Sequence, residues 1–284
     1  MKFALVVNLS KERAIKYAKK ISLFLLDKNA EIAMIEECSQ YFKGIHIHYS
    51  KNITELFEYC DMAITVGDGT IIHAAKYAAK ADKQLIGVNV GRLGFAADVE
   101  PHEYEQLERL ITGDYTTEER ILLDVEVIKE DGSKHYLAVN DAVVARGQLS
   151  KTIDLHLTLD GDEISKYRAD GLLFATPTGS TAYSLSAGGP ILAPKMECIL
   201  MTPVCPHSLF SRSVLFSGES ELSVHVKIPE ECCCVLTIDG EKNVPVLATD
   251  RVVIRKSDLK LKLALLHNRN FYKLLNEKLK ERDF

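Results

Sequence analysis

The segment between positions 61 and 75 constrains the fold most, because a strand pattern runs straight into a helix pattern there. Residues 63–66 form a short apolar run rich in β-branched side chains, which predicts a buried strand. Apolar residues at 71, 72, 74, 75, 78 and 79 then follow helical spacing, which predicts a helix over residues 71–81. Only Gly67, Asp68, Gly69 and Thr70 connect the two elements.

This short connection has the composition of an anion-binding turn. Gly67 and Gly69 allow a turn that a Cβ would obstruct, and they let the backbone approach a ligand closely. The turn opens a helix, whose first N–H groups and positive dipole end favour a phosphate. Asp68 then has two interpretations. Either Asp68 or Thr70 is an N-cap, or Asp68 accepts a proton from, or orients, a hydroxyl that attacks a phosphate.

The first 115 residues alternate strand and helix patterns. Strands are predicted at residues 3–7, 31–35, 63–66 and 84–89, and helices from Lys11 onward and at 54–59, 71–81 and 102–111. Residues 38–50 fit neither pattern clearly. Such alternation predicts a parallel sheet with helices on its faces, in which ligands bind beyond the carboxyl ends of the strands. Asp68 and the loop at residues 91–95 both follow predicted strands.

From Arg120 the pattern changes to short strands joined by turns. Strands are predicted at residues 121–127, 136–144 and 153–159 and near Ile199, Leu222, Val235 and Val252, with Asp160-Gly161 as a hairpin turn. We predict an α/β domain with a parallel sheet at 1–117, and an antiparallel β-sandwich at 118–256. The last segment, 257–284, has alternating leucines and a helix at 271–280, and we expect it to return to the first domain.

Composition excludes several classes. A net charge of −5 gives no basis for bulk nucleic-acid binding. The start of the chain lacks a signal-peptide pattern, and no window reaches the roughly 20 apolar residues of a transmembrane helix, so we expect no membrane association. Seven cysteines without regular spacing indicate a reducing cytoplasm. The run Cys232-Cys233-Cys234 chelates poorly, because neighbouring strand side chains point to opposite faces, and no metal site is predicted.

One stretch of the β domain differs from its surroundings. Seven hydroxyl side chains fall between Thr176 and Ser186, within a segment that runs from Asp170 to Pro190. Serine and threonine are common turn and cap residues, which is the structural alternative. The stretch is nevertheless too long and too rich in donors for a simple turn. Hydroxyls, small residues and the ring of Tyr183 suit a nucleoside, which needs hydrogen-bond partners and a surface to stack on.

These residues resemble the ATP-dependent NAD kinases. The family pattern has Gly-Gly-Asp-Gly-Thr, where this chain has Val66-Gly67-Asp68-Gly69-Thr70, then an Asn-Glu/Asp pair, here Asn140-Asp141. The long Thr-Pro-Thr-Gly-Ser-Thr-Ala-Tyr motif and its Ser-Ala-Gly-Gly-Pro extension are essentially complete at 176–190. The shorter Gly-Asp-Gly-Thr core also resembles phosphofructokinases and diacylglycerol kinases. Val66 departs from the pattern: its side chain narrows the phosphate turn, or the strand runs one residue longer.

The resemblance implies a role for each matching residue. Asp68 would be the base acting on the adenosine 2′-hydroxyl, within a phosphate-donor turn of Gly67, Gly69 and Thr70. Asn140 and Asp141 would hold adenosine groups, in a pocket also lined by Thr178, Thr181, Ala182, Tyr183, Ser184, Leu185 and Ser186. Asp170 and the backbone near Cys205 would face the nicotinamide end. Lys151 and Arg168 would bind phosphate, as groups that family sites draw from a neighbouring subunit, and the turn at Asp239 would approach the substrate. The alternative of a core or surface role applies most strongly to Lys151, Cys205 and Asp239.

The resemblance further implies a cytoplasmic protein that makes NADP from NAD and ATP, with Mg²⁺ or another divalent ion. It also implies a homodimer or homotetramer, with a site shared by the two domains. The chain has no Walker A motif, so its phosphate site is not a P-loop. Two alternatives stay open: a related kinase acting on a lipid or sugar phosphate, and a non-catalytic NAD(P)-binding protein, which only Val66 supports. The sequence leaves undecided whether polyphosphate replaces ATP, whether NADH is accepted, the oligomer size and any feedback regulation.

Overall fold

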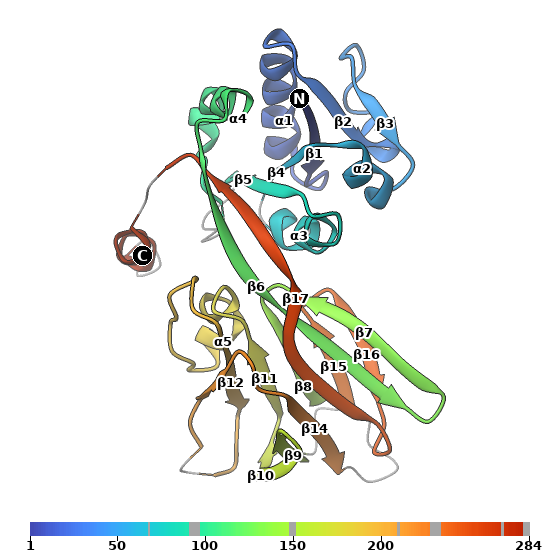
Figure 1. Cartoon of the computed structure of the whole chain (residues 1–284), viewed down its shortest axis with the longest axis vertical. Coiled ribbons are helices and arrows are strands. Elements are labelled where there is room, and N and C mark those ends of the chain that lie inside the picture. The colour runs from blue at the N-terminus through green and yellow to red at the C-terminus, as the bar shows by residue number, and fades with distance from the viewer. Residues whose placement is uncertain are drawn as a thin grey trace. The chain divides into compact units, whose positions relative to one another are not determined.

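The chain forms two compact units. The computed structural model describes residues 1–67, 69–90, 97–147, 152–208, 211–227, 234–267 and 270–280. One unit comprises Met1–Glu119 and Leu261–Phe284, and the other comprises Arg120–Lys260 (Figure 1). Among the helices that the structure describes, none is both long and apolar enough to cross a bilayer.

The first unit is built on a parallel sheet. Its strands are β1 (Lys2–Val7), β2 (Glu31–Ile35), β3 (His48–Ser50), β4 (Met62–Val66), β5 (Gln84–Val88) and the last part of β17 (Arg251–Leu265). They lie in the order β17-β5-β4-β1-β2-β3, and neighbouring strands are parallel. The helical elements are η1 (Glu36–Cys38), α1 (Glu12–Asp27), α2 (Ile53–Tyr59), α3 (Thr70–Lys80), η2 (Pro101–Leu107), α4 (Glu108–Thr112) and α6 (Phe271–Lys280).

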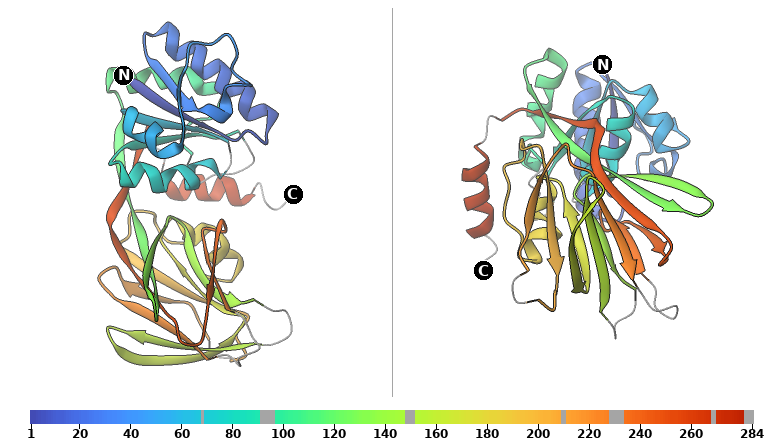
Figure 2. Two further views of the ribbon diagram at one scale, coloured as in Figure 1. Left: turned by 90° about the vertical axis from the view of Figure 1, so that its right-hand side faces the viewer. Right: turned by 60° about the horizontal axis from the view of Figure 1, so that its bottom comes forward.

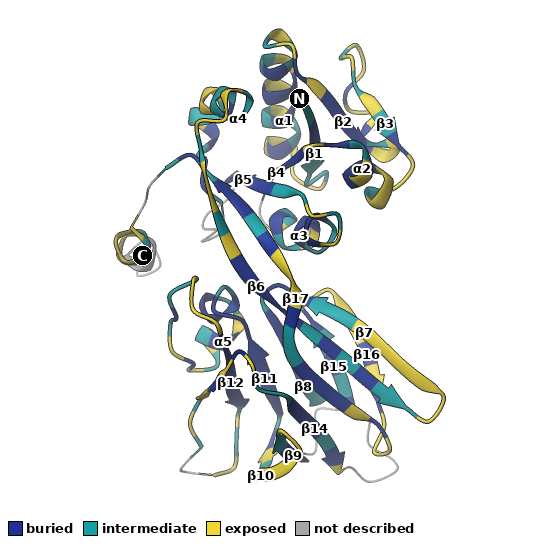
Figure 3. Cartoon of the chain, in the orientation of Figure 1, coloured by how far each residue is buried: buried dark blue, intermediate teal, exposed yellow. Residues whose placement is uncertain are grey.

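The helices of this unit bury the faces that their spacing predicts. α1 contacts β1, β2 and β4, and it buries Ala14, Ala18, Ile21 and Leu25. α3 contacts β4 and β5, and its small buried residues, mostly alanine, let it lie close to the strands (Figure 3). The segment at 38–50, which fitted neither pattern, contains the end of η1 and the short edge strand β3.

The second unit is an antiparallel sandwich, as predicted. One sheet has, in order, β10 (Asp162–Ala169), β9 (Ile153–Leu159), β14 (Leu222–Lys227) and the first part of β17. In the same sheet, β6 (Thr116–Lys129) pairs with β17 and with β7 (Gly132–Ala138). The other has β13 (Val214–Ser217), β12 (Cys198–Val204), β11 (Gly171–Ala175), β8 (Asp141–Arg146), β15 (Cys234–Ile238) and β16 (Lys242–Val246), in that order. Figure 2 shows these strands from two further sides.

Alternating side chains of both sheets fill the sandwich core. Leu155 and Leu157 from the first sheet and Phe174 and Met201 from the second belong to one fully buried cluster. A second cluster covers the opposite face of the second sheet, where Leu192 packs on the strands. β8 and β11 are thus buried on both faces, so their polar residues belong at the strand ends.

One predicted strand is wrong. Residues 136–144 are mainly apolar, with polar residues only at Asn140 and Asp141, but β7 ends at Ala138 and β8 begins at Asp141. The two strands belong to different sheets, so the chain crosses from one sheet to the other at Val139 and Asn140. Apolar alternation does not reveal this crossing, because both strands face the same core. The crossing places Asn140 and Asp141 at a sheet end instead of inside a strand.

Candidate functional site

The turn between β4 and α3 has the backbone that its glycines predict. Gly67 has φ of 119° and Gly69 has φ of 73°, both in the region that favours glycine. A Cβ on Gly67 would lie 2.8 Å from the Cβ of Asn8. Gly69 occupies the N-cap position and Thr70 is the first helical residue, so Thr70 does not cap the helix. Asp68 and the loop at 91–95 lie outside the described residues. The catalytic role of Asp68 therefore stays a prediction.

Val66 continues the strand. It is the last residue of β4, pairs with Val7 and Val88 in the neighbouring strands, and is fully buried. Its side chain therefore packs in the core of the first unit. Of the two readings of this departure from the family pattern, the structure supports the longer strand.

Two asparagines that sequence reasoning missed lie beside this turn. Asn8 follows β1 and donates its N–H to the carbonyl of Val66 at 3.1 Å, while its Oδ1 accepts from Ser10. Asn89 follows β5, and its Nδ2 donates to Glu100 at 3.3 Å. The carboxyl ends of β1, β4 and β5, which are neighbours in the sheet, thus carry Asn8, Gly67 and Asn89. The signal for both was available, since each is the first polar residue after a strand.

In the second unit, Asn140 and Asp141 lie beside the start of the hydroxyl-rich segment. Thr176 follows β11 and donates its N–H to the carbonyl of Asn140 at 2.9 Å. A Cβ on Gly179 would come within 2.0 Å of that same carbonyl oxygen, so only glycine fits there. Asp239 lies at the same end of the sheet, since β15 ends at Ile238 opposite Ala142 of β8. The structure therefore brings together the two parts of the sequence that the resemblance assigns to adenosine and the turn at Asp239, which it assigns to the substrate more generally.

The hydroxyl-rich segment divides into supporting and exposed side chains. It contains η3 (Gly179–Thr181) and the short helix α5 (Tyr183–Ser186). Ser180 is buried, donates to the carbonyl of Pro177 at 2.7 Å and accepts from the N–H of Leu192 at 3.0 Å. Ser184 is also fully buried, and its hydroxyl lies 3.1 Å from that of Thr202. Both side chains therefore support the segment from within.

The same segment also has an exposed aromatic side chain, that of Tyr183. Tyr183 is 47% exposed, which leaves its ring available for stacking on a base. Ser186 is exposed, Thr178, Ala182 and Leu185 are half-buried, and Thr181 is buried. Arg120, which sequence reasoning missed, is buried and donates to the hydroxyl of Thr178 at 3.3 Å. A cation thus lies directly beside this segment.

The residues assigned to the nicotinamide end lie at the opposite end of β11. Asp170 directly precedes β11, and Arg146 at the end of β8 contacts both of its carboxylate oxygens at 2.9 Å. Cys205 follows β12, is exposed, and has φ of +46°. Four residue steps of β11 separate this end from the end that carries Asn140, or roughly 14 Å at about 3.4 Å per step. Arg146 was also missed, because its pairing with Asp170 depends on strand register.

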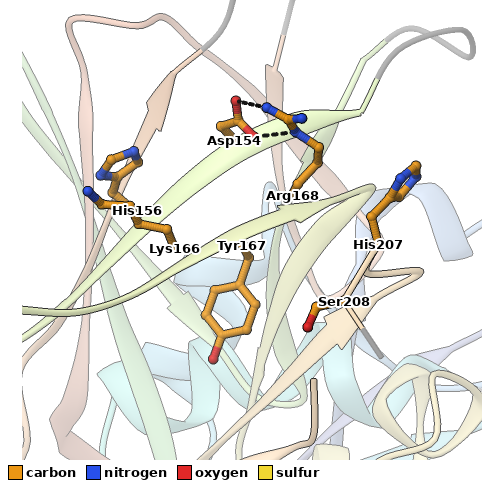
Figure 4. Close-up of a pocket in the computed structure, with 7 residues that line it drawn as sticks. All are labelled: Asp154, His156, Lys166, Tyr167, Arg168, His207 and Ser208. Atoms are coloured by element: carbon orange, nitrogen blue, oxygen red, sulfur yellow. Dashed lines mark hydrogen bonds and ion pairs between the residues drawn. The ribbon is translucent and has the colours of Figure 1, made fainter. Parts of the chain in front are cut away.

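Arg168 lies in a pocket of the second unit. The pocket has a volume of about 610 Å³ and is lined by Asp154, His156, Lys166, Tyr167, Arg168, His207 and Ser208 (Figure 4). The guanidinium donates to both oxygens of Asp154, at 2.8 and 3.0 Å, and this pairing lowers the pKa of the carboxyl. The Arg168 side chain is 66% exposed, so its remaining N–H groups face solvent. Lys151 lies outside the described residues.

Comparison with known proteins gives a consistent result for both units. The family model described as the ATP-NAD kinase N-terminal domain matches residues 3–115, and the one described as the ATP-NAD kinase C-terminal domain matches residues 139–266. A protein named NAD kinase from Natranaerobius thermophilus is 35% identical over 278 residues, covering 97% of this chain and 96% of the relative. Another, from Cellvibrio japonicus, is 36% identical and covers 97% of this chain and 94% of the relative.

Two solved structures have the same fold. Yeast NADH kinase complexed with NADH matches with a TM-score of 0.86 at 25% identity, over 99% of this chain and 87% of the yeast chain. An NAD kinase from Archaeoglobus fulgidus in complex with ATP matches with a TM-score of 0.78 at 25% identity, over 99% of both chains.

Proposed function

This chain belongs to the ATP-NAD kinase family, and we propose that it transfers the γ-phosphoryl group of ATP to the adenosine 2′-hydroxyl of NAD. The oxygen of that hydroxyl forms a bond to phosphorus as the bond to ADP breaks, and Asp68 accepts the hydroxyl proton. The observation that carries the proposal is the joint presence of both family domains and of the whole Thr176-to-Pro190 motif in one chain. The products are NADP and ADP.

The turn at Gly67 and Gly69 supplies the phosphate-donor side. The N–H groups of a first helical turn have no partners within their own helix, so the start of α3 is suited to oxygens of the transferred phosphate. Mg²⁺ enters with ATP as part of the substrate and offsets the charge that develops on the phosphate oxygens. Asn8 and Asn89 follow the adjacent strands and add polar groups at the same sheet edge.

The second unit supplies the acceptor side. Asn140 and Asp141 hold the adenosine, and the exposed ring of Tyr183 stacks on the base. Asp170 and the backbone near Cys205 suit the nicotinamide end. Because these two groups of residues lie at opposite ends of β11, we propose that one NAD molecule draws on more than one subunit of a homodimer or homotetramer. The exposed guanidinium of Arg168 then serves a phosphate bound by the neighbouring subunit.

An acceptor screen tests this function. The purified protein is incubated with ATP and Mg²⁺ and with NAD, NADH, fructose 6-phosphate or diacylglycerol in separate reactions, and phosphorylated product is measured by mass spectrometry. We expect NAD to give a product that an NADP-specific dehydrogenase accepts. Phosphorylation of the sugar phosphate or the lipid without NADP formation would contradict the proposal. A non-catalytic role has lost its main argument, since Val66 is an ordinary strand residue.

A further inference from the structure

The carboxylate of Asp239 accepts hydrogen bonds from three consecutive backbone N–H groups. Its Oδ1 accepts from Asn140 at 2.7 Å, Asp141 at 3.1 Å and Val139 at 3.1 Å, and its Oδ2 lies 3.0 Å from the N–H of Val139. The N–H of Asp239 itself donates to the carbonyl of Asp141 at 2.9 Å. Asp239 lies in the turn between β15 and β16, about a hundred positions along the chain from the groups that it contacts.

Thr176 completes the hydrogen bonding of the same backbone from the other side. Its hydroxyl donates to the carbonyl of Val139 at 2.7 Å, and its N–H donates to that of Asn140 at 2.9 Å. All three N–H groups and all three carbonyls of residues 139–141 therefore have a partner in Asp239 or Thr176. Gly179 packs directly on the carbonyl of Asn140, since a Cβ there would lie only 2.0 Å from the carbonyl oxygen.

We propose that Asp239 is a positioning residue for the kinase reaction, which orients Asn140 and Asp141 toward the adenosine without touching the substrate itself. The inference rests on the function proposed above. Hydrogen bonds from backbone N–H groups to a carboxylate are stronger than those between neutral groups. Leaving these partly buried N–H groups without a partner carries a desolvation penalty. Without this carboxylate, residues 139–141 would leave their present conformation, and the side chains of Asn140 and Asp141 would move with them.

The chemistry of the contact favours a carboxylate. Asparagine keeps an Oδ1 that accepts from all three N–H groups, but it replaces Oδ2 by an NH₂ group, which is itself a donor and lies against the N–H of Val139. Asp239→Asn should therefore weaken the contact, and Asp239→Ala should remove it. Asp239 also has φ of +50°, a conformation that asparagine tolerates well and alanine tolerates less. The two variants thus form a graded pair.

Asp160 offers a matched control. It also precedes a glycine in a hairpin turn of the second unit, has φ of +51°, and accepts a backbone N–H, that of Glu221, at 2.9 Å. Its N–H donates to the carbonyl of Glu221, just as that of Asp239 donates to Asp141. Asp160→Ala and Asp160→Asn therefore cause comparable backbone strain and affect a side-chain bond to one backbone N–H, that of Glu221, which lies outside residues 139–141.

The test combines hydrogen exchange with kinetics on the full-length protein. We expect Asp239→Ala to speed amide exchange at residues 139–141 by at least about tenfold, and to raise the KM for NAD by about tenfold, with the KM for ATP within about twofold. Asp239→Asn should fall between this variant and the wild type, and it also serves if the alanine variant does not fold. The Asp160 variants should leave both the exchange at 139–141 and the KM for NAD near wild-type values.

Three results would overturn the proposal. In the first, exchange at residues 139–141 stays slow in both Asp239 variants, so the carboxylate does not hold this backbone. In the second, exchange quickens but the KM for NAD does not change, so the contact does not serve the substrate. In the third, the Asp160 variants raise the KM for NAD as much, and the effect is one of general stability. A wild-type protein that forms no NADP would instead overturn the proposed function, while the exchange result would still decide whether Asp239 holds the turn.

Discussion

The turn at Gly67 and Gly69 in the first unit and residues 139–141 in the second take their conformation from different sources. The first is set locally, by two glycines at positive φ and the strand and helix on either side. The second contains no glycine, and residues 37 and 100 positions away supply its hydrogen bonds. The comparison shows that the proposed phosphate turn is specified by a few adjacent residues, whereas the residues proposed to bind the nucleoside depend on the assembled sandwich.

The largest effect should come from Asp68→Asn in the first region. The amide cannot accept the 2′-hydroxyl proton, and loss of positioned general-base catalysis typically lowers turnover by ~10²–10⁴. A purely structural role predicts almost no loss, since asparagine is nearly isosteric with aspartate and the N-cap position of α3 belongs to Gly69. Turnover at saturating ATP and NAD checks this prediction. Near-normal turnover would return Asp68 to a structural role.

In the second region, Gly179→Ala should be next in size. The new Cβ would meet the carbonyl oxygen of Asn140, so the backbone must shift, and overpacking of this kind typically costs about 1–3 kcal/mol. We expect a lower melting temperature together with a KM for NAD raised at least about tenfold. The control is Gly161→Ala, which meets no atom within 4 Å but is strained by its φ of +94°. Equal effects of both variants on the KM for NAD would show that Gly179 matters for stability alone.

Arg168→Ala should have a smaller effect, confined to substrate binding. The side chain is largely exposed, so we expect little change in melting temperature. If Arg168 serves a phosphate on a neighbouring subunit, the KM for NAD should rise several-fold in the oligomer. Lys166→Ala, which removes another cation from the same pocket, is the control. A protein that light scattering shows to be a monomer and that is fully active at the same concentration would count against the shared site. Unchanged kinetics of Arg168→Ala would do so too.

The smallest effect concerns thiol reactivity, which compares the two units without any mutation. Burial raises the pKa of Cys38 and of Cys60 in the first unit to about 11, so few of these thiols are ionised at pH 8. Cys205 in the second unit is exposed. Brief alkylation at pH 8, followed by peptide mass spectrometry, should label Cys205 before Cys38 and Cys60. Labelling of Cys38 or Cys60 at the same rate in the folded protein would contradict the burial of these side chains.

The elements near the motifs were predictable from the sequence, because their patterns are local. The buried stripe of α3, the Asp160-Gly161 hairpin and the sandwich of the second unit all follow from spacing and turn chemistry. The crossing at Val139 and Asn140 was not predicted, because β7 and β8 face one core and the only break between their apolar residues is the short polar pair Asn140-Asp141.

Long-range partners were the other part that pattern reasoning missed. Asp239 stands in the sequence as one more Asp-Gly turn, and nothing local distinguishes it from Asp160. Only the pairing of β15 with β8 brings its carboxylate to residues 139–141. The same holds for Arg146, which reaches Asp170 because β8 and β11 are neighbours. Such contacts depend on strand register, which a single sequence leaves open.

The central claim is that catalysis and substrate positioning are divided between these two regions. One kinetic comparison tests it most directly: kcat and NAD affinity, measured separately for Asp68→Asn and Asp239→Ala at saturating ATP. The account predicts that Asp68→Asn loses turnover and keeps its NAD affinity, and that Asp239→Ala loses affinity for NAD far more than turnover. Loss of the same parameter in both variants, or normal turnover in Asp68→Asn, would contradict it.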